Sequence, residues 1–228
     1  MRVSIMLFLA YLIILNHLIA QEKNIVIPAG INPIIDGNIG SKEWENSVKL
    51  PLNGGESVYF QKYKDTLYIA VKGKSGGFCS LAIGNQTNLR ILHSSTALIT
   101  AAYENKNGVW TLVHNFAGPK TNQGEHSHDT DRFWQDYRKS NFDQFNWFAN
   151  LVTMGNPADT EYQIPISELK NDNIYVSIVF YQARAQVRIA KLPKDLSDGM
   201  IDRELISGSA RNGLDFNPGN WIQLLGLN

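Results

Sequence analysis

Residues 57–73 read SVYFQKYKDTLYIAVKG. They contain two runs of β-branched and aromatic residues, 57–63 and 66–73, which the polar pair Lys64-Asp65 separates. Such runs on either side of a short polar break are typical of a β-hairpin. Two further runs, 89–104 and 108–116, are split by the polar break Asn105-Lys106-Asn107-Gly108. Asn-Gly readily adopts the positive φ angles of a tight turn, so we predict a second hairpin here.

Further strand-like runs follow along the chain, and helical periodicity is scarce. These runs are 77–84, 146–154, 160–166, 173–183 and 220–227. Short strands at this spacing, with 18 glycines and many Asn and Asp breaks, indicate an all-β protein. We therefore expect an antiparallel β-sandwich of the jelly-roll or immunoglobulin-like type, with few short helices, such as 41–47 and 167–170.

The first twenty residues have the anatomy of a secretory signal peptide. Arg2 precedes a nearly continuous apolar run at 3–15, and Ala20 precedes a polar segment. A membrane anchor is the alternative, but Asn16 and His17 interrupt the run before it reaches the roughly 20 residues of a spanning helix. We expect 1–20 to be removed and 21–228 to form one exported domain, periplasmic, extracellular or on the cell surface.

Charge and cysteine content exclude some classes of protein. The chain has 21 basic and 21 acidic residues, so no net charge favours nucleic acid or an acidic membrane surface. Cys79 is the only cysteine, which rules out an internal disulfide. It lies in an apolar segment and is predicted to be a small buried hydrophobic residue.

Several motifs occur in a recognisable order. Residues 31–47, INPIIDGNIGSKEWENS, combine a Pro-x-Ile-Asp-Gly turn (Pro33, Ile35, Asp36, Gly37) with Glu43 and Trp44. A strand at 65–71 follows, then Glu161 with Ile164-Pro165-Ile166 and Leu169, and finally Trp221 with Leu224 and Leu227. This series resembles family 9 carbohydrate-binding modules and the related DOMON-like β-sandwiches. The resemblance implies a β-sandwich that binds sugar through aromatic residues, often with structural calcium. Its motif residues are expected to be scaffold, including Trp44 and Trp221.

A long insertion at 118–147 concentrates aromatic residues. Seven lie within 133–148: Phe133, Trp134, Tyr137, Phe142, Phe145, Trp147 and Phe148. Aromatic faces stack on pyranose rings, and planar polar groups bind hydroxyls. The candidate ligand-binding residues are Trp134, Tyr137, Arg132, Trp147, Trp110, Gln135 and Asn141. The alternative is that these rings pack the insertion onto the sandwich, since aromatic side chains bury much apolar area.

The polar tip of the insertion offers a candidate metal site. His126 and His128 lie two residues apart and would project from one face of an extended segment. With Asp129 and Asp131 they could bind zinc or another divalent ion, and the carboxylates alone could hold calcium. A solvated loop tip is the simpler interpretation.

A haem-binding branch of the fold, with axial Met or His ligands, offers another alternative. Met154, His93 and His114 are the residues available. His93 follows two aliphatic residues in a strand, so a hydrogen-bonded interior or edge histidine is the simpler interpretation.

Catalytic signatures are weak. Gly73-Lys74-Ser75 lacks the earlier glycine of a phosphate-binding loop. Surface carboxylates such as Glu125 and Asp136 could in principle serve a glycosidase. The sequence favours a secreted, non-catalytic protein that binds carbohydrate or polysaccharide. The alternatives are a secreted scaffold or interaction protein of the same fold, then a metal-assisted enzyme or haem-binding protein. The oligomeric state is left open.

Overall fold

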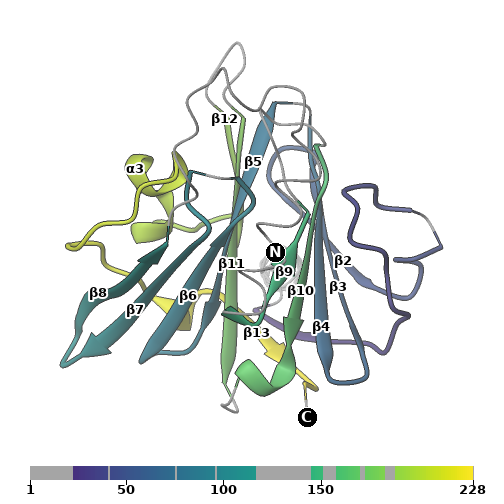
Figure 1. Ribbon diagram of the computed structural model, residues 1–228, viewed down its shortest axis with the longest axis horizontal. Coiled ribbons are helices and arrows are strands. Elements are labelled where there is room, and N and C mark those ends of the chain that lie inside the picture. Colours follow the sequence, from purple (N-terminus) through teal and green to yellow (C-terminus); the bar gives the residue numbers. More distant parts are fainter. Residues whose placement is uncertain are drawn as a thin grey trace, which may run out of the picture.

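The computed structural model describes residues 23–40, 42–74, 76–95, 97–116, 145–150, 158–169, 173–182 and 188–227. The protein consists mainly of two β-sheets that face each other (Figure 1). Helical structure among these residues is limited to one short α-helix and three 3-10 turns. The predicted all-β, antiparallel sandwich is confirmed.

The larger sheet has eight strands in the order β1-β13-β11-β5-β6-β7-β8, with β12 paired to β11. Its members are β1 (Asn24–Val26), β5 (Gly77–Gly84), β6 (Asn88–His93), β7 (Thr100–Lys106), β8 (Val109–Phe116), β11 (Ile174–Gln182), β12 (Arg188–Leu192) and β13 (Ile222–Leu225). The β1–β13 pair is parallel and the other pairs are antiparallel. The predicted Asn-Gly hairpin is confirmed, because Asn107 and Gly108 join β7 to β8 with φ angles of 56° and 82°.

The smaller sheet has five strands in the order β2-β3-β4-β10-β9. They are β2 (Val48–Pro51), β3 (Ser57–Tyr63), β4 (Thr66–Lys72), β9 (Phe148–Ala149) and β10 (Thr160–Pro165). The first predicted hairpin is the pair β3–β4, closed by Tyr63 opposite Thr66, and Lys64 at its turn has a φ of 51°. A 3-10 turn, η1 (Ile166–Glu168), follows β10 and overlaps the first part of the predicted helical piece 167–170.

The main core lies between the sheets. Alternate residues of β3 and β4 face it from the smaller sheet, as the period of two in a strand requires. Phe60, Ile69 and Leu81 are among its fully buried members. Cys79 is also buried in this core, as the sequence predicted.

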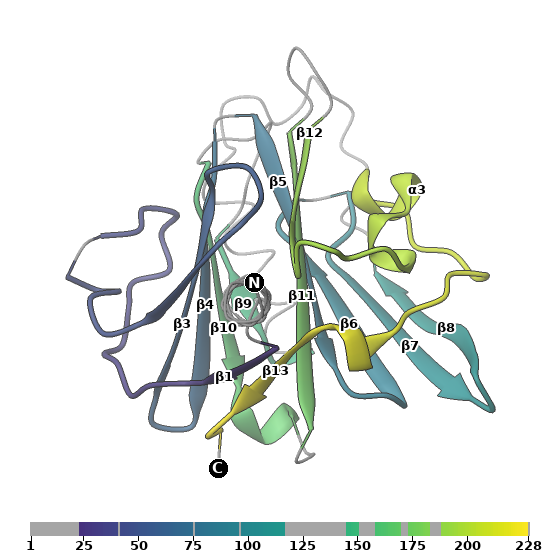
Figure 2. The same ribbon diagram turned by 180° about the vertical axis from the view of Figure 1, so that it is seen from behind.

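A second core covers the outer face of the larger sheet. Residues 193–221 cross this face and carry η2 (Gly199–Ile201), α3 (Arg203–Ile206) and η3 (Pro218–Asn220) (Figure 2). Met200, Phe216 and Trp221 pack there against sheet residues that include Trp110. Both faces of this sheet are therefore buried over much of its area.

A loop at 28–47 covers the outer face of the smaller sheet. Ile39 and Trp44 pack there against Tyr68 and Ala70 of β4. The helix predicted at 41–47 is wrong, because residues 42–46 form turns. The backbone bonds here span only three residues, from Ser47 N to Trp44 O for example, and Trp44 is directed into the sheet rather than along a helical surface.

Trp44 and Trp221 are both buried, as expected of scaffold residues. Within the described part of the chain, no helix combines the length and apolar character needed to cross a membrane.

Candidate functional site

A cavity of about 320 Å³ lies between the two sheets, toward the β6–β8 side of the larger one. Figures 1 and 2 show β6, β7 and β8 fanning away from the smaller sheet in this region. We call this cavity the inter-sheet cleft. Its apolar walls include Leu92, Ala102, Val113 and Ile164. Its polar residues are Asn85, Asn88, Arg90, Glu104 and Glu168.

An ion pair organises the polar side of the cleft. The guanidinium of Arg90, on β6, lies 3.1 Å from Glu168 Oε2 at the end of η1. The other oxygen of Glu168 accepts a hydrogen bond from Asn146 Nδ2 at 2.9 Å. The Arg90 side chain also donates to the carbonyl of Phe145 at 3.4 Å. These contacts join the larger sheet to η1 and to residues 145–146, and both charged side chains keep part of their surface exposed.

Aromatic residues are grouped near another side of the cleft. Trp147 lines it and packs at a ring distance of 6.4 Å from Tyr162 of β10. The indole Nε1 of Trp147 donates to Thr100 Oγ1 at 3.0 Å. Nearby, the ring of Phe145 lies 5.2 Å from that of Phe116, the last residue of β8. The two residues that bound 117–144 therefore meet next to the cleft.

Two of the ligand-binding candidates from the sequence fall on described residues, and the structure does not bring them together. Trp147 is 5% exposed and belongs to the core between the sheets. Trp110 is also 5% exposed but belongs to the second core, on the opposite face of the larger sheet. Its Nε1 donates to the Phe216 carbonyl at 2.8 Å. Both indoles are therefore packing residues, and neither presents a free ring face to solvent.

The remaining candidates lie outside the described residues. These are the ligand-binding candidates Arg132, Trp134, Gln135, Tyr137 and Asn141 and the metal candidates His126, His128, Asp129 and Asp131. Among the residues that are described, no group of three or more His, Cys, Asp or Glu side chains is placed to hold a metal ion.

The three residues considered as haem ligands can also be located relative to the described structure. His93 is buried, and its Nδ1 lies 2.6 Å from Ser80 Oγ, which agrees with the predicted hydrogen-bonded interior histidine. His114 is exposed, and its ring lies 5.1 Å from that of Phe145. Met154 lies outside the described residues.

The sequence analysis did not identify Arg90 or Glu168 as candidate site residues. Arg90 stands between Leu89 and Ile91, which both face the second core. Strand alternation therefore turns Arg90 toward the inner face, where a charged side chain is unusual and signals an unfilled space or a partner. Its partner Glu168 is 78 residues away, and local patterns carry no information about that pairing.

A buried carboxylate, Glu161, lies on the outer face of the smaller sheet. Its Oε2 accepts from the backbone N–H groups of Asp36 and Gly37 at 3.1 and 2.8 Å, and its Oε1 accepts from Trp44 Nε1 at 3.1 Å. Burial raises the pKa of Glu161, and these three donors act in the opposite direction. These hydrogen bonds hold the 28–47 loop against the smaller sheet. Asp36, Gly37 and Trp44 of this loop therefore have a structural role.

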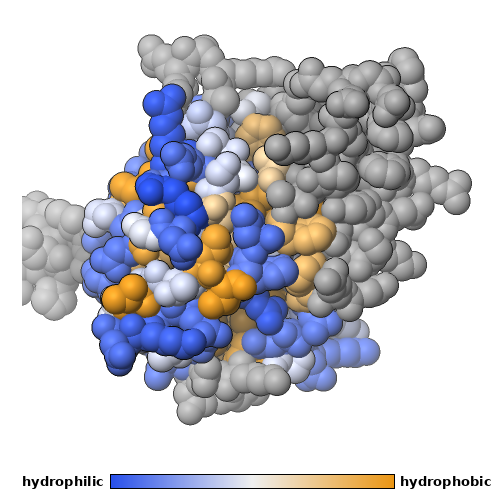
Figure 3. Space-filling model, turned by 60° about the vertical axis from the view of Figure 1, so that its left-hand side comes forward, coloured by the Kyte–Doolittle hydropathy of each residue, from blue (hydrophilic) through white to orange (hydrophobic). Residues whose placement is uncertain are grey.

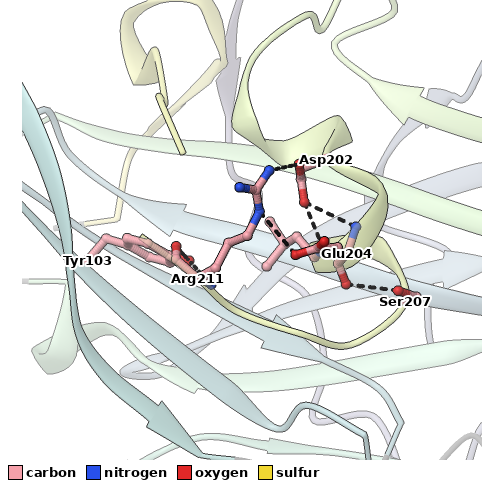
Figure 4. A network of polar contacts seen from close by, with 6 residues as sticks. Tyr103, Asp202, Glu204, Ser207 and Arg211 are labelled. Carbon is pink, nitrogen blue, oxygen red and sulfur yellow. Dashed lines mark hydrogen bonds and ion pairs between the residues drawn. The ribbon is translucent and has the colours of Figure 1, made fainter. Parts of the chain in front are cut away.

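A second, more polar hollow of about 540 Å³ lies among residues 193–220. Arg211 bridges Asp202 at 2.6 Å and Glu204 at 3.2 Å, and Tyr103 Oη donates to the Arg211 carbonyl at 2.9 Å (Figure 4). The hydrogen bond from Arg211 lowers the pKa of Asp202. Asp202 also caps α3, so its contacts hold the C-terminal segment on the sheet.

No family model matches the chain, and comparison with curated proteins and with solved structures finds no match either.

Proposed function

We propose that this protein is an exported, non-catalytic carbohydrate-binding β-sandwich and that the inter-sheet cleft contributes to glycan binding. The observation that supports this most is the cleft itself. It combines an aliphatic wall with a guanidinium, carboxylates and side-chain amides at its polar side. Sugars need that combination, because their rings have apolar faces and their hydroxyls both donate and accept hydrogen bonds.

The dimensions of the cleft agree with a small ligand or one part of a longer chain. Its volume of about 320 Å³ is at the lower end of the roughly 300–1,000 Å³ range of small-molecule pockets. Arg90 and Glu168 orient each other, and Asn146 fixes the second oxygen of Glu168. Such mutual positioning reduces the ordering cost when a hydroxyl binds. A guanidinium and a carboxylate side by side supply donors and acceptors to neighbouring hydroxyls.

Glycan-array and polysaccharide pull-down assays with residues 21–228 test the proposal. Arg90→Ala removes the guanidinium from the cleft, and Arg203→Ala removes an exposed arginine of α3 as a matched control. Losing a charge-assisted hydrogen bond costs about 1.5–3 kcal/mol, so we expect Arg90→Ala to weaken binding roughly 10- to 100-fold. The control variant should bind like the wild type, and thermal unfolding should show both variants folded.

A third variant, Trp134→Ala, separates the cleft from the insertion. Loss of binding in Trp134→Ala with normal binding in Arg90→Ala would place the ligand surface in the insertion. That is the location predicted from the sequence. Absence of binding to any glycan by the wild type would contradict the proposal. It would favour the alternative of a secreted scaffold or interaction protein with the same fold.

A further inference from the structure

Two rows of side chains cross β6, β7 and β8. Directly opposed residues of antiparallel strands project from the same face of a sheet. The first row is Asn88, Glu104 and Thr111, and the second is Arg90, Ala102 and His114. Their chain neighbours Leu89, Tyr103 and Trp110 belong to the second core, on the outer face of the sheet. Both rows therefore project from the inner face, and we call them the β6–β8 platform.

The platform is open to solvent. Thr111 and His114, its members on β8, are exposed, and the side chain of Arg90 is 42% exposed. One row further along the strands, Leu92 and Thr100 are buried, where the core between the sheets begins. The difference arises because β6, β7 and β8 fan away from the smaller sheet (Figures 1 and 2). Figure 3, in which this side of the molecule comes forward, shows hydrophilic surface interspersed with hydrophobic surface.

The platform continues the inter-sheet cleft. Four of its members line the cleft, namely Asn88, Arg90, Ala102 and Glu104. Thr111 and His114 extend the same rows by one strand, onto β8. A β-bulge places Val113 between them without changing the pairing of either row. The cleft therefore opens sideways onto an exposed surface that is built from the same two rows.

The platform offers hydrogen-bonding groups at a regular spacing. Its first row carries an amide, a carboxylate and a hydroxyl, and its second row carries a guanidinium and an imidazole. Neighbouring strands lie about 4.8 Å apart, and successive rows on one face lie roughly 7 Å apart along a strand. A polysaccharide repeats its hydroxyls from one sugar unit to the next, so several units can reach several of these groups. A single sugar unit enclosed in the cleft leaves Thr111 and His114 unused.

From this continuity we propose that the cleft and the β6–β8 platform form one binding surface, which holds a stretch of several sugar units of a polysaccharide chain. The inference rests on the proposed function, because it names the class of glycan that the same site binds. Groups on three strands share the contact, so each added sugar unit adds hydrogen bonds until the platform is filled. Affinity should therefore rise with the number of sugar units.

Isothermal titration calorimetry with oligosaccharides of two and six sugar units tests this dependence on length. The probes are oligosaccharides of β-1,4-glucan, β-1,3-glucan, α-1,4-glucan and β-1,4-xylan. In a series that binds, we expect the six-unit probe to bind at least roughly tenfold more tightly than the two-unit probe. Equal affinity for the two lengths would overturn the inference and leave the proposed function standing. Binding to none of the four series would overturn it as well, and the glycan array then decides separately on the proposed function.

A double variant assigns the length dependence to the platform. Thr111→Ala/His114→Ala removes the groups on β8 and keeps the residues that line the cleft. We expect roughly tenfold weaker binding of the six-unit probe and unchanged binding of the two-unit probe. Asn38→Ala/Glu45→Ala is the matched control, since both residues are exposed on the loop over the outer face of the smaller sheet, and it should bind like the wild type. An equal loss for both probes, or no loss for the six-unit probe, would contradict the proposal.

Discussion

The indole Nε1 of Trp44 donates a hydrogen bond of 3.1 Å to Oε1 of Glu161, a residue 117 positions away. The two side chains join the 28–47 loop to β10 across the outer face of the smaller sheet. The other oxygen of Glu161 accepts from two backbone N–H groups of the same loop. One carboxylate therefore satisfies three donors, and the hydrogen bonds from Gly37 and Trp44 are buried.

Substitution of Glu161 should destabilise the fold more than substitution of Trp44. Glu161→Ala leaves three donors unsatisfied, and at about 1–3 kcal/mol for each buried group we expect a loss of roughly 3 kcal/mol or more in unfolding free energy. Trp44→Phe removes one donor and should cost less, about 1–2 kcal/mol. Urea unfolding measures both, with Glu45→Ala as an exposed control in the same loop. A Glu161→Ala loss no greater than that of the control would disprove the structural role.

The Cys79 thiol should be unreactive in the folded protein. Burial raises its pKa to about 12, so almost no thiolate forms near neutral pH, and the side chain is inaccessible. We expect a disulfide-exchange reagent such as DTNB to label Cys79 only as fast as the protein unfolds. Labelling in urea at increasing concentration should follow the unfolding transition. Rapid labelling without denaturant would show that the thiol is exposed.

A methyl group at Gly77 should strain the larger sheet. A Cβ built at Gly77 on β5 would overlap the ring of Phe180, which lies diagonally across from it on β11. Overpacking of this kind costs about 1–3 kcal/mol, so Gly77→Ala should lower the midpoint of thermal unfolding. Gly219→Ala is the control, because its nearest neighbour would be 3.5 Å away. The penalty of Gly77→Ala should shrink in a Phe180→Ala background, and an undiminished penalty would show that the ring is not its cause.

Local patterns were sufficient to predict the hairpins. The β3–β4 hairpin follows from two runs with a polar break, and the β7–β8 hairpin from Asn107-Gly108. The buried Cys79 and the scaffold tryptophans were also predicted correctly. In each of these cases, chain neighbours or a single apolar segment carry the information.

The predictions that failed depend on contacts between segments that lie far apart in the sequence. Trp110 and Trp147 were candidates for a ligand surface, but periodicity cannot tell which face of a strand another segment will cover. Residues 193–221 cover Trp110, and the facing sheet covers Trp147. The Arg90–Glu168 pair joins segments 78 residues apart, which no local pattern indicates. The incorrect helix at 41–47 has a similar cause, because Trp44 is held by a distant carboxylate.

Glu161 also gives stability a defined pH dependence. Burial, with a smaller contribution from the charge of Asp36, raises the pKa of Glu161 above its ordinary value of 4.5. The folded state therefore holds this proton more tightly than the unfolded state. The contribution of Glu161 to stability is complete below pH 4.5 and is lost as the pH rises through the folded-state pKa.

The measurement is the unfolding free energy of the wild type minus that of Glu161→Gln, taken from urea titrations at pH values from about 4 upward. Glutamine keeps the shape of the side chain and does not titrate, so other ionisable groups cancel in the difference. We expect this difference to fall as the pH rises above 4.5, with a slope of at most about 1.4 kcal/mol per pH unit. A difference that rises with pH would mean that the three donors outweigh burial and hold the pKa of Glu161 below its ordinary value.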